Sequence, residues 1–172
     1  MSDTSDGITT SSKAISGNFF EDFTIGLQLD HSVPRTITEG DTALYIALTA
    51  DRYPLHCDAE FARSLGFERE TVNDLLVFHT VFGKSVPDLS LNAIANLGYA
   101  DMRFGVPVYP GDTLTAKSEV LGRRESSRGD TGVVWVRTTG RNQRGEGVLT
   151  FIRWFLAGKR DPETVTGIDD SP

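Results

Sequence analysis

Two side chains suited to acid–base chemistry stand close together between positions 51 and 56. Asp51 and His56 are separated by Pro54, which cannot continue a helix and favours an extended conformation at the preceding Tyr53. We therefore expect Asp51 to end one helix and His56 to lie in the first turn of the next, so that both converge on one small molecule. Such a pair suits the addition of water to an activated double bond, because one group takes a proton from water and the other places a proton on carbon.

The spacing also allows a simpler interpretation, in which Asp51 only caps the second helix and His56 is an ordinary surface histidine. Other candidates are weaker. Cys57 follows His56 directly, so on a helix its side chain would diverge by about 100°. His79 fits a hydrogen-bonded core position, and His31 fits a surface position near a strand end. Three scattered histidines and one cysteine match no metal-ligand pattern, so no metal or redox cofactor is expected.

Two helices are expected around this pair. Thr38, with the acidic Asp41 at the third helical position, indicates an N-cap for a helix that runs to about Thr49. A second helix is predicted over Pro54–Leu65, with Gly66 as its C-cap. The acid–base pair would therefore lie at the junction of the two helices.

A third helix is predicted over Asn73–Lys84, with Asn73 or Thr71 as its cap and Gly83 near its end. It is apolar almost all round, and such a helix must be buried. Strand patterns occur at 26–36, ended by Pro34, and then at 101–104, 114–120, 132–139 and 147–157, with a hairpin loop at 140–145. A sheet wrapped around one apolar helix is an α+β architecture of the hotdog type.

The chain has 172 residues, enough for one domain with a hydrophobic core. We expect a single hotdog domain at 17–160 between polar, disordered tails at 1–16 and 161–172. A net charge of −7 argues against a nucleic-acid partner, although a local basic patch would suffice for an anionic ligand. Without an apolar run of membrane-spanning length or a signal-peptide core, and with a single cysteine, a cytoplasmic protein is expected.

The segment Leu48–His56, followed by Ala62, resembles the signature of the MaoC-like dehydratases and (R)-specific enoyl-CoA hydratases. Pro34–Asp41 and Arg103–Asp112 are similar to further signatures of that family. In the family an aspartate and a histidine flank a proline and together bind the catalytic water. The resemblance implies that Asp51 and His56 carry out reversible hydration of a 2-enoyl-CoA, with Asp51 as the general base and His56 orienting the water, or the reverse.

Two further segments, Asp74–Lys84 and Asn92–Tyr99, resemble the mesaconyl-CoA hydratases, or β-methylmalyl-CoA dehydratases. Those enzymes usually contain two hotdog units in one polypeptide, so the resemblance implies a homodimer or higher homo-oligomer here. Apolar residues on both faces of the last strand, such as Phe151 and Trp154, point the same way, because a lone domain would leave part of them wet. The implied substrate is a short, branched, dicarboxylic enoyl-CoA.

The chain departs from the family signature in several places. Ala50 and Tyr53 stand where the family has glycine and asparagine, and Asn73-Asp74 replace a histidine-glycine pair. The backbone amides of Asp74 and Leu75 remain candidates to stabilise the thioester oxyanion. The bulk of Tyr53 near the site would shorten an acyl pocket.

The sequence gives fewer signs of the basic residues that would bind the anionic groups of the substrate. Arg52 or Arg103 could pair with a distal carboxylate, and the candidates for the CoA phosphates are Arg35, Lys84, Arg103 and Arg153. Each of these could equally be a solvated charge. Two other functions stay open: a hotdog thioesterase that releases free CoA, and a non-catalytic acyl-CoA-binding partner subunit.

Overall fold

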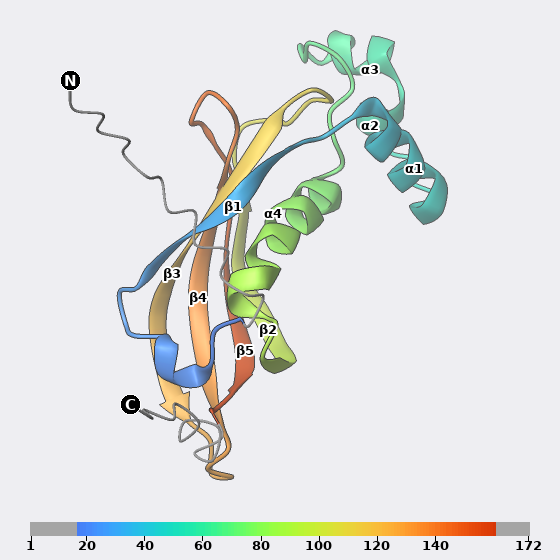
Figure 1. Ribbon diagram of the computed structural model, residues 1–172. Coiled ribbons are helices and arrows are strands. Elements are labelled where there is room, and N and C mark those ends of the chain that lie inside the picture. Colours follow the sequence, from blue (N-terminus) through green and yellow to red (C-terminus); the bar gives the residue numbers. More distant parts are fainter. Residues whose placement is uncertain (1–16, 161–172) are drawn as a thin grey trace, which may run out of the picture.

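The computed structural model describes residues 17–160 (Figure 1); the tails expected at 1–16 and 161–172 lie outside the described residues. The elements in chain order are η1 (Phe20–Asp22), β1 (Gln28–Thr36), α1 (Glu39–Thr49), α2 (Pro54–Cys57), α3 (Ala59–Ser64), α4 (Asp74–Leu89), β2 (Ala93–Phe104), β3 (Thr113–Glu125), β4 (Thr131–Arg141) and β5 (Gly147–Gly158). No helix within this described part is long and apolar enough to cross a membrane.

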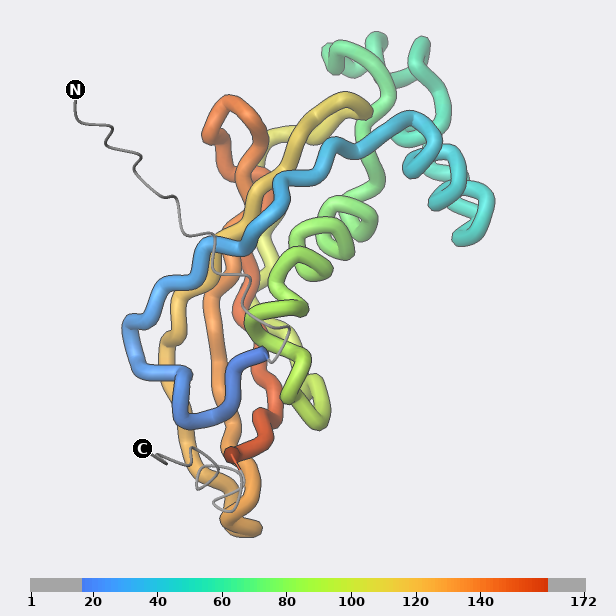
Figure 2. The backbone as a smooth tube through the Cα atoms, in the orientation of Figure 1, coloured from blue at the N-terminus to red at the C-terminus, as the bar shows by residue number. Residues whose placement is uncertain are grey.

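The five strands form one antiparallel sheet in the order β1-β3-β4-β5-β2. The strands β3, β4 and β5 form the centre of the sheet, and α4 packs on one of its faces (Figures 1 and 2). Val77 and Val81 of α4 pack with Leu114 of β3 and Phe151 of β5 in the larger of two core clusters. This confirms the predicted α+β hotdog architecture, a curved sheet around one helix.

The helix α4 is longer and less enclosed than the sequence predicted. It continues past Gly83 and ends at Leu89, with Pro87 in its last turn. The prediction of burial all round is wrong, since Leu75 and His79 are exposed. The helix packs against the sheet on one side, and within residues 17–160 its opposite side is largely uncovered, apart from contacts such as that of Tyr45 in α1 with His79. Its buried face consists of Val77, Phe78, Val81, Ser85 and Leu89.

The helices α1, α2 and α3 lie beyond the end of the sheet, next to the N-terminal end of α4 (Figure 1). The predicted cap of α1 is present, because Thr38 Oγ1 accepts a hydrogen bond from Asp41 N at 3.1 Å and the Asp41 carboxylate accepts one from Thr38 N at 2.9 Å. The single helix predicted over Pro54–Leu65 is instead two. Asp58 interrupts it, because its carboxylate accepts the amide hydrogens of Glu60 and Phe61 and so begins α3.

The strand β1 does not end at Pro34 as expected. It lies at an edge of the sheet, where a missing amide hydrogen is tolerated, and Val33 adopts a left-handed φ of 65° at an irregularity in the pairing with β3. His31 is also placed differently. The expected surface position is wrong, because β1 presents this side chain to α4 and β3, where it contacts Asp88 Oδ2 at 2.6 Å and Ser118 Oγ at 2.7 Å.

The other edge strand, β2, is largely uncovered. Ile94 is 64% exposed and Leu97 is 53% exposed, and the outer edge of β2 pairs with no strand within residues 17–160. The last strand is better covered than the sequence suggested, because Phe151 is buried and Trp154 is half-buried. The uncovered apolar surface therefore follows β2 rather than β5.

Candidate active site

The side chains of Asp51 and His56 meet at 2.7 Å, between Asp51 Oδ2 and His56 Nδ1. Two features of the chain bring them together. Ala50 ends α1 in the left-handed conformation, with φ 53° and ψ 36°, and Pro54 occupies the first position of α2. The pair is only about a tenth exposed, at 13% for the Asp51 side chain and 11% for that of His56. The expected convergence is therefore a direct contact in a partly buried place.

The Asp51 carboxylate accepts three hydrogen bonds. Tyr53 N donates to Oδ1 at 3.0 Å, while His56 Nδ1 and Asn73 Nδ2 contact Oδ2 at 2.7 and 2.6 Å. The backbone hydrogen bond from Tyr53, followed by those from His56 and Asn73, lowers the pKa of Asp51 against the opposing effect of burial. Asp51 is consequently ionised at neutral pH.

An ionised carboxylate can only accept, so His56 must carry its proton on Nδ1 when it is neutral. Its Nε2 then presents a lone pair, and within residues 17–160 this atom has no hydrogen-bond partner. The ring of Tyr53 lies edge-on to that of His56, with 5.3 Å between the ring centroids. The side chain that replaces the family asparagine therefore packs against the imidazole, and its backbone amide holds Asp51.

The N-terminus of α4 begins beside this pair. Asn73 is the N-cap, and its Oδ1 accepts a hydrogen bond from Leu75 N at 2.9 Å. The amides of Leu76 and Val77 donate to the carbonyl oxygen of Asn73. Leu75, one of the two predicted oxyanion donors, is thus already occupied by the cap, whereas the amide of Asp74 has no acceptor within the described residues.

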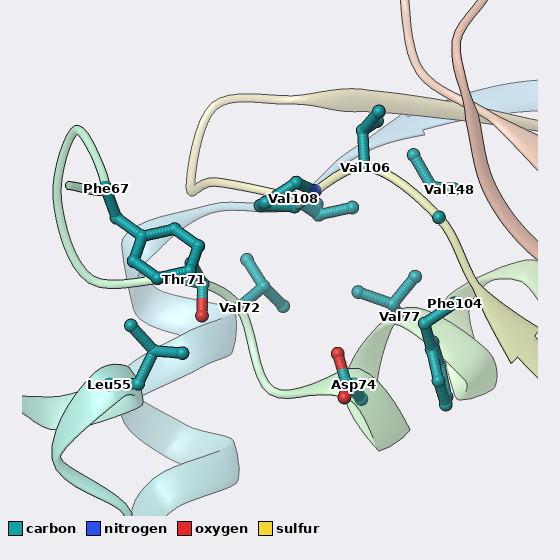
Figure 3. Close-up of a pocket in the computed structure, with 12 residues that line it drawn as sticks. Leu55, Phe67, Thr71, Val72, Asp74, Val77, Phe104, Val106, Val108 and Val148 are labelled. Carbon is teal, nitrogen blue, oxygen red and sulfur yellow. The ribbon is translucent and has the colours of Figure 1, made fainter. Parts of the chain in front are cut away.

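A cavity of about 230 Å³ opens at this helix end (Figure 3). Its walls come from the loops at 67–72 and 105–108, from α2, from the start of α4 and from the ends of β2 and β5. Asp74 is the charged residue among its lining side chains, and Figure 3 shows it at the start of α4. The lining residues are Leu55, Phe67, Thr71, Val72, Asp74, Val77, Phe104, Gly105, Val106, Pro107, Val108 and Val148. Apart from Thr71 and Asp74 these side chains are apolar, and neither Asp51 nor His56 is among them.

His56 lines a second, more open cavity of about 550 Å³ together with Cys57. Cys57 Sγ contacts the carbonyl oxygen of Asp51 at 3.6 Å. Burial, and secondarily the charge of Asp51, raises the pKa of this thiol, which opposes the formation of a nucleophilic thiolate. Arg69 also lines this cavity and pairs with Glu39 and Glu70 at 3.0 and 2.5 Å.

The predicted cations are not gathered at the site. Arg52 is exposed in the turn after Asp51. Arg103 is exposed and pairs with Asp101 at 3.2 Å, and Arg35 pairs with Asp41 at 2.7 Å. Lys84, another of the residues suggested for the CoA phosphates, donates a hydrogen bond to the carbonyl oxygen of Val33.

Arg153 is fully buried, so its proposed contact with a CoA phosphate is wrong. Its Nε donates to Asn96 Oδ1 and its Nη2 to Ser90 Oγ, both at 2.7 Å, and its guanidinium lies against the rings of Phe82 and Phe155. Strand alternation places this residue on the helix-covered face of the sheet. The core position expected for His79 is also wrong, since that ring is exposed and packs beside Tyr45 and Phe78.

Asn73 is the site residue that the sequence did not single out. It was expected only as a helix cap, and its second contact, with Asp51, crosses 22 residues of sequence. The available signal was its position, because an N-cap side chain lies at the mouth of the helix whose amides were proposed to bind the substrate.

The chain resembles known proteins over most of its length. A family model described as "MaoC like domain" matches residues 21–142. Relatives include the β-methylmalyl-CoA dehydratase of Chloroflexus aurantiacus, 58% identical over 88% of this chain, and the mesaconyl-CoA hydratase of Cereibacter sphaeroides, 54% identical over 87%. The chain spans 43% of the length of each, less than half of these relatives.

A solved structure of a MaoC domain protein from Chloroflexus aurantiacus superimposes on this fold with a TM-score of 0.85 at 55% sequence identity. The match covers 94% of this chain and 44% of that one. The family match, which includes Asp51, His56 and the start of α4, extends over more than half of the sequence. The chain therefore belongs to the MaoC-like family.

Proposed function

We propose that the chain is a hotdog unit of an acyl-CoA hydratase/dehydratase, a carbon–oxygen lyase that adds water reversibly to a 2-enoyl-CoA. One observation carries this proposal: an ionised Asp51 fixes His56 with Nε2 as a free acceptor, and Asn73 links this pair to the start of α4, where the amide of Asp74 is unpaired within the described residues. Base and oxyanion donor are the two groups that water addition to a conjugated thioester requires. The names of the two relatives support the same reaction.

The geometry favours His56 as the base, the reverse of the first assignment from the sequence. Asp51 Oδ2 already accepts from His56 and Asn73, and Oδ1 accepts from Tyr53. In the proposed reaction His56 Nε2 removes a proton from water as the water oxygen bonds to C3. The C2–C3 π electrons move to form an enolate, whose oxygen accepts the amide hydrogen of Asp74.

The imidazolium then gives its proton to C2 and the enolate collapses to the thioester. Water has been added to the double bond, and His56 is again neutral. Asp51 stabilises the imidazolium between the two steps, as a carboxylate that remains ionised can do. The helix dipole of α4 adds to the Asp74 amide at the oxyanion. The negative side chain of Asp74 opposes that charge unless it is directed away from it.

We propose a short, branched, dicarboxylic substrate such as mesaconyl-CoA, on the strength of the two relatives. Arg52 follows Asp51 directly and has no ion-pair partner within the described residues, so it is the better placed cation for a distal carboxylate, whereas Arg103 is held by Asp101. A site built for that carboxylate penalises substrates that lack it. We expect mesaconyl-CoA to exceed crotonyl-CoA in kcat/KM by at least about tenfold.

We also propose that the working unit contains two copies of this chain, with β2 at the interface. The strand is a free edge that carries the exposed apolar residues Ile94, Leu97, Tyr99 and Phe104, and uncovered edges of this kind pair readily. The relatives are more than twice as long as the matched region, enough for a second unit. A cytoplasmic location remains part of the proposal, since the enzyme would work where its CoA thioester is.

The test is a hydration assay on a panel of enoyl-CoA thioesters, followed by the loss of enoyl absorbance, with free thiol measured in the same samples. Formation of 3-hydroxyacyl-CoA without free thiol supports the proposal. Release of free CoA would identify a thioesterase. Binding of the thioesters without conversion would identify the non-catalytic partner subunit.

A further inference from the structure

We infer that Asn73 is a positioning residue that couples the Asp51–His56 pair to the N-terminus of α4 in the proposed hydration. The inference rests on the proposed function for its catalytic consequence, but the coupling itself is a property of the resting protein. Asn73 is partly buried between the pair and the helix. No other side chain within residues 17–160 hydrogen-bonds both to the pair and to this helix.

The two ends of the Asn73 amide have different partners. Its Oδ1 accepts from Leu75 N at 2.9 Å, and its Nδ2 donates to Asp51 Oδ2 at 2.6 Å. These partners fix the orientation of the amide, because a flipped group would face an amide N–H with its NH₂ and a carboxylate with its oxygen. Asn73 is therefore a bridge of defined polarity from the first turn of α4 to the carboxylate.

The bridge is anchored on the main chain. The carbonyl oxygen of Asn73 accepts from Leu76 N at 2.9 Å and from Val77 N at 3.1 Å, and the preceding Val72 N donates to Val108 O at 2.8 Å. Asn73 is thus held by α4 and by the loop before β3. The helices α1 and α2, which carry the acid–base pair at their junction, lie beyond the end of the sheet. The contact of Asn73 with Asp51 therefore fixes the position of the pair relative to the amide of Asp74, where the oxyanion would form.

The same contact determines how Asp51 acts. Asn73 Nδ2 and His56 Nδ1 are 3.3 Å apart, and both donate to the single atom Asp51 Oδ2. Two donors leave this oxygen no lone pair for water. The backbone amide of Tyr53, and after it these two donors, lower the pKa of Asp51 and so favour a carboxylate that orients His56.

The substitution Asn73→Ser separates the two roles of this residue. Serine is a good N-cap acceptor, so α4 keeps its cap. Its hydroxyl oxygen lies about where Cγ of Asn73 is, one bond short of the Nδ2 that donates to Asp51, so the contact with Asp51 is lost. The usual strength of a hydrogen bond to a charged group predicts that its loss lowers kcat by about 10- to 100-fold, with KM nearly unchanged. Losing this donor makes the Asp51 carboxylate more basic, so protonation of the coupled Asp51–His56 pair should begin at higher pH. The acidic limb of the kcat–pH profile should therefore move to higher pH.

A matched control removes a cap where no catalysis is proposed. Asp58 is the N-cap of α3, and Asp58→Ala loses two capping hydrogen bonds without touching Asp51. This variant should lower the melting temperature and leave the pH profile in place. If Asn73→Ser behaved like Asp58→Ala, with lower stability but an unchanged kcat and pH profile, Asn73 would be only a cap.

A second measurement needs neither substrate nor a substitution. NMR titration of the wild-type protein should show the carboxyl carbon of Asp51 titrating below its usual range, and an Asn73 side-chain N–H proton whose shift follows the same titration. A titration of Asp51 that leaves the Asn73 amide unmoved would overturn the inference even if Asn73→Ser failed to fold. If this titration is seen but no enoyl-CoA is hydrated, the proposed function fails and the coupling stands.

Discussion

The imidazole of His56 reaches the carboxylate of Asp51 at 2.7 Å across a reversal of only four intervening residues. The reversal depends on the left-handed backbone of Ala50 and on Pro54 at the start of α2. The contact fixes the tautomer of the histidine as well as its position, since the donor to an ionised carboxylate must be Nδ1–H. The reactive atom of the pair is thereby Nε2, which faces away from Asp51.

Removing either member of the pair should abolish most of the hydration activity. Asp51→Asn and His56→Gln keep approximate side-chain shape and remove the carboxylate and the base. Groups of this kind contribute about 10²- to 10⁴-fold, and we expect losses in kcat on that scale with circular dichroism unchanged. Cys57→Ala is the control, because it alters the neighbour of His56 and should retain activity within about twofold. Near-normal rates in both Asp51→Asn and His56→Gln would exclude the assignment.

The backbone at position 50 makes a prediction about stability. A non-glycine residue in the left-handed conformation is strained by roughly 1–2 kcal/mol. Glycine removes this strain, but part of the gain in stability is lost because glycine has more conformational freedom in the unfolded chain. We expect Ala50→Gly to raise the free energy of unfolding by about 0.5–1 kcal/mol in urea titrations. Ala47→Gly, in the exposed interior of α1, should lower it by about 1 kcal/mol. Equal effects of the two substitutions would contradict strain at Ala50.

The architecture and the acid–base pair could be predicted from the sequence because local patterns of residues indicate both. Alternation of apolar and polar residues indicated β3 and the end of β2, and a high content of Val, Trp, Phe and Ile indicated β4 and β5. The Thr38–Asp41 box indicated α1, and the proline between Asp51 and His56 indicated the reversal. Ala50 was noted as a departure from the family glycine, and the structure gives the reason for the glycine: φ is 53° there.

What the sequence could not predict depends on contacts between distant segments. The two contacts of buried His31, with Asp88 and Ser118, span 57 and 87 residues, and Asn73 reaches Asp51 across 22. Hydrophobic patterning also gave no sign of which face of α4 would stay uncovered. That face depends on what packs against this chain.

The reactivity of Cys57 should report the charge of Asp51. Burial and the Asp51 carboxylate raise the pKa of the thiol, so alkylation by iodoacetamide should reach half its maximal rate at a pH above that of an unperturbed cysteine. Asp51→Asn removes a negative charge that disfavours the thiolate, so the half-point should move to lower pH. His56→Gln keeps the carboxylate and should leave the half-point near that of the wild type. An unchanged half-point in Asp51→Asn would show that the two groups are not electrostatically coupled.

The apolar surface of β2 leads to a prediction about assembly. Leu97 is 53% exposed on a strand whose outer edge has no partner within residues 17–160. In a symmetric dimer each copy buries the same residue, so one substitution acts twice. Burying a leucine is favourable by about 1.5–3 kcal/mol, and Leu97→Lys should weaken dimerisation by at least about tenfold.

Sedimentation velocity over a range of protein concentrations, with the hydration assay at the same concentrations, measures this effect. Ile25→Lys is the matched control, because Ile25 is 70% exposed but precedes β1 at the opposite edge of the sheet. We expect the control to sediment like the wild type and Leu97→Lys to dissociate, losing activity in proportion to the monomer fraction. Two outcomes would contradict the prediction: activity that increases as the monomer fraction increases, or a wild-type protein that is an active monomer at every concentration. Either would show that the site is complete in one copy and that the exposed strand serves another contact.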